Sequence, residues 1–267
     1  MMNKFKHVHL YAEPSSSTLN MGEVASYVKD MLQCNVDVRE EFFKCFLTED
    51  KIDYIVNEIV ATKVFDPRKP FTRHEPAPIE IEFEKKVLAD PHKRCLGILY
   101  DGFELQPIFN ELIPSRENNL EHVHIAFTNR LVCTYGENDS RYHYRAIICG
   151  YPTVVCTSGI VEAPAKPREF YFLQQYYASM GNMNLDDVKK KFEGRFIDYD
   201  DARLTEVVKG YVMQGLFYYI NGNPFCTKKE CRLLNAHWQE DLIESQVNNG
   251  NLCQDHLKIL DDFKTII

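Results

Sequence analysis

No run of apolar residues in this 267-residue sequence approaches the length of about 18 that a membrane-spanning helix needs. The amino-terminal segment also lacks the apolar core and small-residue cleavage site of a secretory signal, so we expect a cytoplasmic protein. Basic residues are in deficit, with 31 Lys and Arg against 39 Asp and Glu. Because a nucleic-acid partner normally requires a basic face, we expect neither a nucleic acid nor a membrane as partner.

Several familiar binding and catalytic motifs are absent as well. The sequence has no glycine-rich dinucleotide fingerprint, no phosphate-binding P-loop, no EF-hand calcium loop and no nucleophile elbow. Assignments as a nucleotide-binding protein, a calcium-binding protein or a serine hydrolase therefore have no motif support. Internal repeats and low-complexity tracts are missing too, and 45% hydrophobic with 26% charged residues is ordinary for a globular protein.

The nine cysteines do not form the pattern of a disulfide framework. Their number is odd, and several lie in apolar segments, such as those that hold Cys95, Cys149 and Cys156. Buried free thiols in a reducing compartment explain this distribution better than disulfides do. Only the cysteines near the carboxyl end stand apart by their spacing.

Alternating strand and helix patterns predict a mixed fold. Apolar periodicity in the first part predicts strand-like segments over 6–12, 36–43 and 94–100, and helices over 21–33, 48–62 and 79–89. Prolines make 66–78 an irregular connector. Short β-branched and aromatic segments then predict a central sheet from strands over 121–127, 130–135, 143–149 and 153–157. Helical patterns follow over 168–181, 185–193, 200–220, 236–247 and 253–263.

This order of elements predicts an α+β or α/β protein with a mixed sheet. We expect an N-terminal α/β region over 1–115 and a second region over 116–267, which holds the central sheet and a helical C-terminal part. The two regions are expected to form one compact unit. The helix over 200–220 should be buried, because one continuous apolar stripe runs along it through Leu204, Val207, Val208, Tyr211, Val212, Gly215, Leu216 and Tyr219.

The most specific chemical pattern is Cys226-x4-Cys231 followed, 21 residues later, by Cys253-x2-His256. Three thiols and one imidazole can give Zn²⁺ a closed tetrahedral shell, which holds structure and leaves no position for a substrate. We therefore predict one structural zinc per chain. His237 is an alternative fourth ligand, and three ordinary buried cysteines with an exposed histidine remain the competing interpretation.

The arrangement of a buried helix that leads into Cys226 resembles the archaemetzincins, zinc peptidases with the signature HExxHxxGxxHC. Gly222 falls on the glycine of that signature, Cys226 and Cys231 on its first two structural cysteines, and Leu233 on its methionine. The second cysteine pair of the family is replaced by Cys253-x2-His256, two residues late. The three catalytic histidines and the glutamate are replaced by Gly215, Tyr219, Phe225 and Leu216.

The resemblance implies a zincin-like scaffold that retains its structural zinc and has lost the metal-activated water of peptide hydrolysis. That would be a degenerate metallopeptidase. The stretches around Phe127-Thr-Asn-Arg-Leu131 and Thr157-Ser-Gly159 also resemble an uncharacterised archaeal family classed among metallopeptidases. Such a protein would act as a binding or scaffold module, with an unknown small molecule or peptide in its cleft.

A second group of candidate residues lies in the middle of the chain. Arg141, His143 and Arg145 alternate along an extended segment, so they should share one face that could bind an anion, with His143 as an acid or base. Alternatively, the arginines pair with nearby acids on the surface. The segment 158–167 is predicted to be a functional loop in which Glu162 could act as a general base and Lys166 could bind an anion, or in which the two form a solvated pair.

Two hydrolytic alternatives follow from these residues. In one, His143, Glu162 and Lys166 form a catalytic centre with the arginines as anion-binding groups. In the other, His124, His143 and His237 bind a second, catalytic zinc. His122 and His124 share one strand face, a spacing that can chelate a metal, but the sequence shows no third ligand for them.

Overall fold

The structure is a computed structural model that describes residues 4–95, 97–181 and 185–266. Its centre is a five-stranded sheet in the order β2 (Asn35–Arg39), β1 (His7–Tyr11), β4 (His122–Thr128), β8 (Thr153–Cys156) and β7 (Ile147–Ile148). The first four strands are parallel, and β7 is antiparallel to β8. A three-stranded sheet of β3 (Leu99–Asp101), β5 (Leu131–Gly136) and β6 (Arg141–Tyr144) lies beside it. The predicted α+β fold with a mixed sheet is confirmed.

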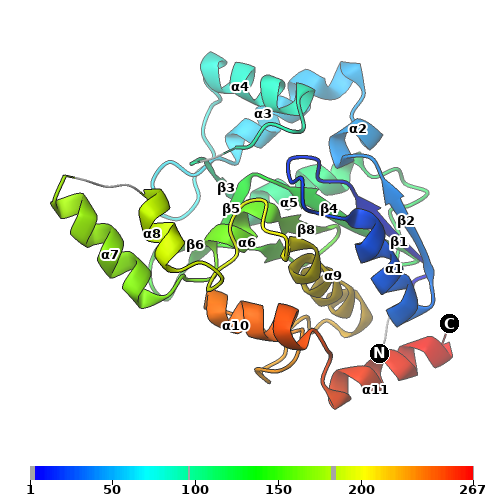
Figure 1. Cartoon of the computed structure of the whole chain (residues 1–267). Coiled ribbons are helices and arrows are strands. Elements are labelled where there is room, and N and C mark those ends of the chain that lie inside the picture. Colours follow the sequence, from blue (N-terminus) through cyan, green and yellow to red (C-terminus); the bar gives the residue numbers. More distant parts are fainter. Residues whose placement is uncertain (1–3, 96, 182–184, 267) are drawn as a thin grey trace.

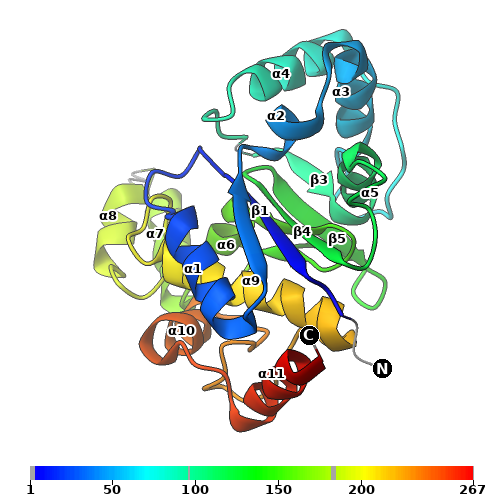
Figure 2. The same ribbon diagram turned by 90° about the vertical axis from the view of Figure 1, so that its right-hand side faces the viewer.

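Helices cover both faces of the central sheet, as Figures 1 and 2 show. One face packs against α1 (Met21–Leu32) and α9 (Leu204–Asn221), with α10 (Gln239–Ile243) and α11 (Gln254–Ile266) outside them. The other face packs against α2 (Phe42–Phe46), α3 (Ile52–Ala61) and α5 (Gly102–Leu112), next to α4 (Pro78–Ala89). The remaining helices are α6 (Thr157–Glu162), α7 (Arg168–Ser179), α8 (Leu185–Lys191), η1 (Glu49–Lys51) and the π-helix η2 (Glu244–Asn249).

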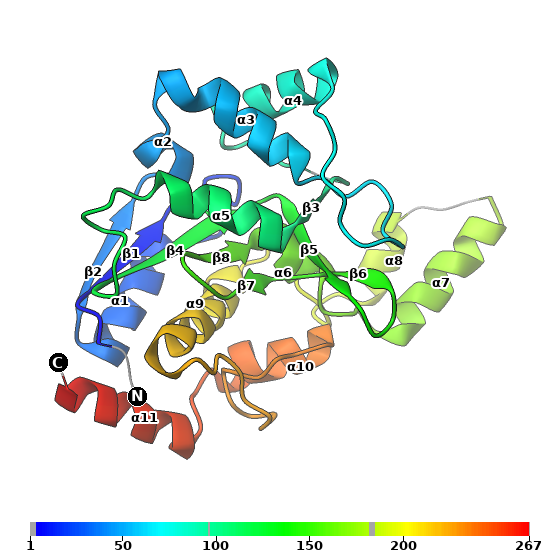
Figure 3. The same cartoon turned by 180° about the vertical axis from the view of Figure 1, so that it is seen from behind.

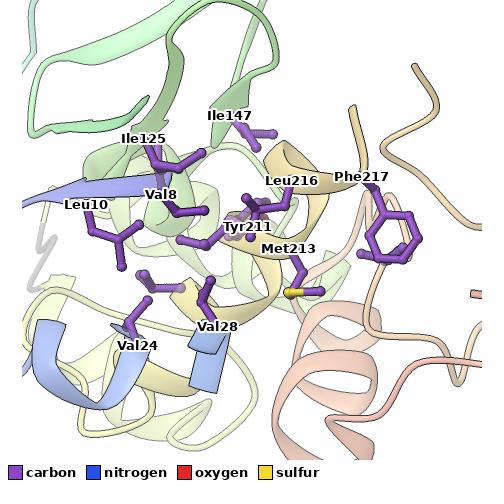
Figure 4. Packing of buried hydrophobic residues seen from close by; sticks show 14 of the residues in the cluster. Val8, Leu10, Val24, Val28, Ile125, Ile147, Tyr211, Met213, Leu216 and Phe217 are labelled. Carbon is purple, nitrogen blue, oxygen red and sulfur yellow. The ribbon is translucent and has the colours of Figure 1, made fainter. Parts of the chain in front are cut away.

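Helix α9 is the predicted buried helix, and it is enclosed on nearly all sides. Figure 4 shows Tyr211 and Leu216 of this helix facing Val8 and Ile125 of the sheet. A Cβ atom at Gly215 would lie 2.9 Å from the side chain of Thr153, so glycine is what lets the helix approach β8. The helix begins four residues later than predicted, because a left-handed residue at Asp200 (φ 57°) interrupts helical geometry.

Several predicted boundaries differ from the structure for identifiable local reasons. The extended segment 36–43 stops at Arg39, because the Glu41 side chain accepts the N–H of Lys44 and starts α2. The segment 143–149 is divided between β6 and β7. The expected functional loop over 158–167 begins as helix α6, which Gly159 allows by packing against the carbonyl oxygen of Arg145.

The sheet combines strands from both predicted regions of the chain. Strand β1, from the predicted N-terminal region, lies between β2 and β4 and forms parallel ladders with both. Helix α5, which the sequence patterns did not predict, begins where the Asp101 carboxylate accepts the N–H groups of Phe103 and Glu104. Within the described ranges, every helix is too short or too polar to span a bilayer.

Candidate metal centre

The four predicted ligands come from two loops that follow α9 and precede α11. Helix α9 ends at Gly222, whose left-handed conformation (φ 78°) turns the chain away from the helix axis. The loop then folds back on itself, because the N–H of Cys226 donates to the carbonyl of Leu233 at 2.8 Å. Cys253 lies directly before the first residue of α11, and His256 lies within the first turn of that helix. Both loops meet below α9 (Figure 1).

The ligand atoms of this group converge on one point. One ligand atom from each of Cys226, Cys231, Cys253 and His256 lies within 4.8 Å of the others. The Sγ atoms of Cys226 and Cys253 are 4.0 Å apart, and Nδ1 of His256 lies 3.7 Å from Sγ of Cys231 and 3.0 Å from Sγ of Cys253. In a tetrahedron with zinc–sulfur bonds of 2.3 Å, the sulfur atoms are separated by about 3.8 Å. These spacings fit a zinc ion.

Two thiols of the group differ in their readiness to ionise. Burial raises the pKa of the Cys231 thiol to about 12. Burial acts in the same direction on Cys253, but hydrogen bonds from the backbone N–H of His256 and from the other thiols outweigh it and lower the pKa of Cys253. The difference arises because Cys253 stands at the start of α11, where free N–H groups favour a thiolate. A bound cation would draw both thiols into the thiolate form.

The protein provides all four positions of a closed shell. His256 is buried beneath α9, and its ring meets the ring of Phe217 edge-on at 5.1 Å. His237, the alternative ligand, lies elsewhere: its backbone carbonyl accepts the N–H of Ala165, and the residue lines a separate cavity. A closed Cys3His shell can hold two loops together, but it leaves no site at which a substrate could coordinate.

The residues of α9 that the sequence comparison aligned with catalytic positions cannot form a metal site. Gly215 has no side chain and packs against β8, and Leu216 is fully buried in the core. The ring of Tyr219 packs 4.6 Å from that of Tyr151. Neither of the two potential metal-binding groups among the described residues includes a residue of α9.

The three residues of the predicted anion-binding face separate into two environments. Arg141 and His143 both contact the carboxylate of Asp139, at 2.7 and 2.8 Å, as expected for surface pairs. Arg145 instead donates to the hydroxyl of Thr134 at 2.8 Å and lines a cavity of about 430 Å³. Burial lowers the pKa of the Arg145 guanidinium. Of the three, only Arg145 lines this cavity and lacks an acidic partner among the described side chains.

Glu162 and Lys166 form a pair with each other. The Lys166 ammonium donates to the carbonyl of Val161 at 3.2 Å and to the Glu162 carboxylate at 3.4 Å. The lysine is buried and packs over the ring of Phe196. Among the described residues, no hydrogen bond or ion pair joins this pair to His143, whose partner is Asp139. Glu162 and Lys166 therefore contact each other, but His143 is not in contact with them, so the three predicted catalytic residues do not form one group.

His122 and His124 lie next to histidines of the neighbouring strand. The parallel register places His7 opposite His122 and His9 opposite His124. One ligand atom from each of His9, Glu117 and His124 lies within 4.8 Å of the others. His9 and Glu117 were not predicted from the sequence, although the alternation His7-x-His9 at the start of β1 indicates the first of them.

One protein-family model matches nearly the whole chain. A family model described as "Probable metallopeptidase family (DUF6775)" matches residues 4–263. A zinc-dependent peptidase from Methanocorpusculum labreanum (strain Z) is similar among solved structures, with 12% sequence identity and a TM-score of 0.41, over 95% of this chain and 99% of that chain. No curated protein matches the sequence.

Proposed function

The chain belongs to the probable metallopeptidase family, and from this premise we propose that it is an archaemetzincin-like member with a structural zinc and without the classical HExxH centre. The zinc would be bound by Cys226, Cys231, Cys253 and His256. The observation that carries the proposal is the convergence of these four ligand atoms within 4.8 Å. An archaeal origin and a reducing cytoplasmic compartment, which would keep the thiols available to a metal, belong to the same proposal.

The packing of α9 supports the loss of classical catalysis. Metal-dependent hydrolysis needs side chains that bind the ion and a base that takes a proton from its water. The positions of the signature instead hold Gly215, Leu216, Tyr219 and Phe225, which offer neither two imidazoles nor a carboxylate. We propose that α9 acts as a core helix and delivers the chain to the zinc ligands.

A ligand cleft is proposed at the cavity that Arg145 lines. This cavity of about 430 Å³ lies between the end of α9 and the β6–β7 segment, and Phe225 and His237 also line it. A partly buried guanidinium without an acidic partner has lost hydration that an anionic ligand group would restore. We therefore propose that the cleft binds a small molecule or a peptide through a carboxylate group.

The alternative of an active hydrolase around His143, Glu162, Lys166 and His237 has less support. His143 shares Asp139 with Arg141, and Glu162 pairs with Lys166. Of these four residues, only His237 lines the proposed cleft. Because neither histidine contacts the Glu162–Lys166 pair, these groups have no common arrangement that would pass a proton to a substrate.

The metal content of the purified full-length protein tests the proposal. Native mass spectrometry should find a tightly held zinc that resists dilution in wild type and is lost in both Cys226→Ser and Cys253→Ser. Cys45→Ser is the matched control, because Cys45 is a free cysteine outside the group. Retention of this zinc in both variants at the wild-type level would contradict the structural site.

The cleft has a separate test. Binding of carboxylate-terminated peptides, followed by calorimetry, should be weakened in Arg145→Gln. Arg141→Gln should bind like wild type, because Arg141 is exposed and paired with Asp139. Equal affinities for all three proteins would remove Arg145 from the proposal and leave the zinc assignment untouched.

A further inference from the structure

Four histidines face one another across two neighbouring parallel strands. His7 and His9 alternate on β1, and His122 and His124 alternate on β4, so all four side chains leave the same face of the sheet. The ring centroids of His7 and His122 are 4.7 Å apart, and those of His9 and His124 are 4.8 Å apart. This is the face that α5 covers (Figure 3), away from the zinc ligands near α11.

A carboxylate completes the group. Glu117 lies in the connection between α5 and β4, and one of its oxygens comes within 4.8 Å of the ligand atoms of His9 and His124. His9 is 4% exposed and His124 is 3% exposed, so neither imidazole is a surface group. Two imidazoles and a carboxylate are a ligand set that zinc and similar divalent ions accept.

Neighbouring groups hold the imidazoles in fixed orientations. Nδ1 of His9 lies 2.5 Å from the carboxylate of Asp37, which leaves Nε2 directed toward Nδ1 of His122 at 2.9 Å. Nδ1 of His124 lies 2.7 Å from the hydroxyl of Tyr11. Metal-binding histidines characteristically use the second ring nitrogen in this way, because an outer hydrogen bond fixes the ring and its tautomer.

Arginine side chains hold the carboxylates beside the group in place. The carboxylates of Asp37 and Glu117 both accept hydrogen bonds from Arg39, at 2.8 and 2.6 Å. The exposed Arg116 also contacts the Glu117 carboxylate, at 3.5 Å, so two guanidiniums balance the two carboxylates beside the imidazoles. Nε2 of His124 lies 3.1 Å from the backbone oxygen of Glu117, so a metal bound there would take the place of this hydrogen bond.

The group borders a cavity on one side. His124 and Glu117 line a cavity of about 330 Å³, together with His122, Tyr151 and Tyr219. Three protein ligands beside an accessible cavity leave a fourth coordination position for water or a small ligand. The Cys3His group has no such position, because its four protein ligands already close the shell.

We propose that His9, His124 and Glu117 bind a divalent first-row transition metal ion, zinc or one of similar chemistry, with one coordination position open to this cavity. The site has the two-histidine, one-carboxylate ligand set and the free position of metal ions that activate water. It does not depend on the structural zinc, since the two groups share no residue.

Cobalt binding to the zinc-loaded full-length protein tests the site. With the Cys3His group filled by zinc, added Co²⁺ should bind one further position and give visible d–d bands without a thiolate-to-cobalt charge-transfer band. Azide should then shift the d–d bands, because it can enter the open position. Absence of a second metal, or a spectrum with the thiolate band, would overturn the proposal.

Two ligand variants and a control assign the residues. Glu117→Gln and His9→Gln should each weaken Co²⁺ binding by more than about tenfold, the smallest effect expected even for groups outside the ligand shell. His7→Gln should bind like wild type, because His7 neighbours His122 but lies outside the ligand group. If His9→Gln lowers the helical circular dichroism, its weaker Co²⁺ binding could come from misfolding, and the test then rests on Glu117→Gln. This variant keeps an oxygen that can accept the hydrogen bond from Arg39. Wild-type affinity in Glu117→Gln would contradict the site.

The outcome is separable from that of the structural zinc. Cys226→Ser should lose the tightly held zinc and keep the cobalt site with its azide response. If instead the cobalt site were lost in Cys226→Ser while Glu117→Gln bound normally, the second metal would belong to the cysteines and the histidine site would be wrong.

Discussion

The ring of Phe5 packs 4.8 Å from the ring of Phe263, and this contact joins the segment before β1 to the last helix of the fold. Both side chains are fully buried. With the proposed zinc bound, helix α11 would be held at two points, by Cys253 and His256 at its start and by Phe263 near its end. The two attachments are chemically different, so each can be removed without the other.

Removal of the metal should loosen the start of α11 and the loop that holds Cys226. We expect amide hydrogen exchange to accelerate over residues 223–234 and 251–258 after treatment with a chelator, while β1 and β4 stay protected. A ligand present at about 1,000 times its dissociation constant stabilises the state that binds it by about 4 kcal/mol. Loss of this stabilisation is large enough to make local opening of these segments much more frequent. Exchange measured by mass spectrometry checks this, and unchanged protection in both segments would contradict a metal-dependent C-terminal region.

Phe263→Ala should destabilise the protein by about 3–5 kcal/mol, because it leaves a cavity between α11 and Phe5. Urea denaturation measures the loss. The neighbouring Asp262→Ala is the matched control, since Asp262 is exposed on the same helix. A loss below 1 kcal/mol, about the control's expected value, would mean that α11 is not packed on the amino-terminal segment in solution.

Glu84→Gln should cost about 3–5 kcal/mol, because it leaves the buried Arg130 guanidinium without its carboxylate, whereas Lys63 keeps Glu80 as a partner. Glu84 is fully buried and contacts Arg130 at 3.0 Å and Lys63 at 3.7 Å. Glu82→Gln, on the exposed side of the same helix, should change stability little. Thermal and urea unfolding of the two variants compare them directly, and equal midpoints would show that Arg130 finds another partner.

The carboxyl group of Glu13 should make the stability of the fold depend on pH. Burial raises the pKa of its carboxyl group, and hydrogen bonds from Ser15 only partly oppose this. The folded state thus binds a proton more tightly than the unfolded state, whose glutamate pKa is about 4.3. Stability from Glu13 is present below that value and is lost as the pH rises through the folded-state pKa.

Glu13→Gln should remove this loss, so the variant should gain in stability over wild type between pH 4 and pH 7. Urea midpoints at the two pH values measure it. Glu40→Gln serves as the control, because Glu40 is exposed in the next turn of chain after β2. A midpoint difference that stays constant with pH would show that Glu13 ionises normally in the folded protein.

The sequence could predict features whose cause is local. The stripe on α9 and the spacing Cys226-x4-Cys231 are carried by neighbouring residues, and the structure brings the four ligands of that pattern together. The partnership of His9 with His124 could not be predicted, because it depends on the register between two strands from distant parts of the chain. Single-sequence periodicity contains no information about which strands become neighbours.

Two errors in the predicted secondary structure have local causes. The prolines at 164 and 167 suggested a loop from Ser158 onward, but the N–H of Gly159 donates to the Cys156 thiol and starts helix α6 before they are reached. Helix α5 was not predicted, and it contains Pro107, a residue that removes one helical hydrogen bond and crowds the carbonyl four residues earlier.

The position of β1 between β2 and β4 has a consequence for synthesis. His7 pairs with Asn35 of β2 on one side and with His122 of β4 on the other. During synthesis, β1 can therefore pair with β2 before β4 has been synthesised. At a translation rate of 5–20 residues per second, the second partner emerges roughly 4–17 s after the first. During that interval the growing chain presents an unpaired strand edge with Val8 and Leu10. Nascent chains of this protein should therefore depend on ribosome-associated chaperones more than the finished fold does.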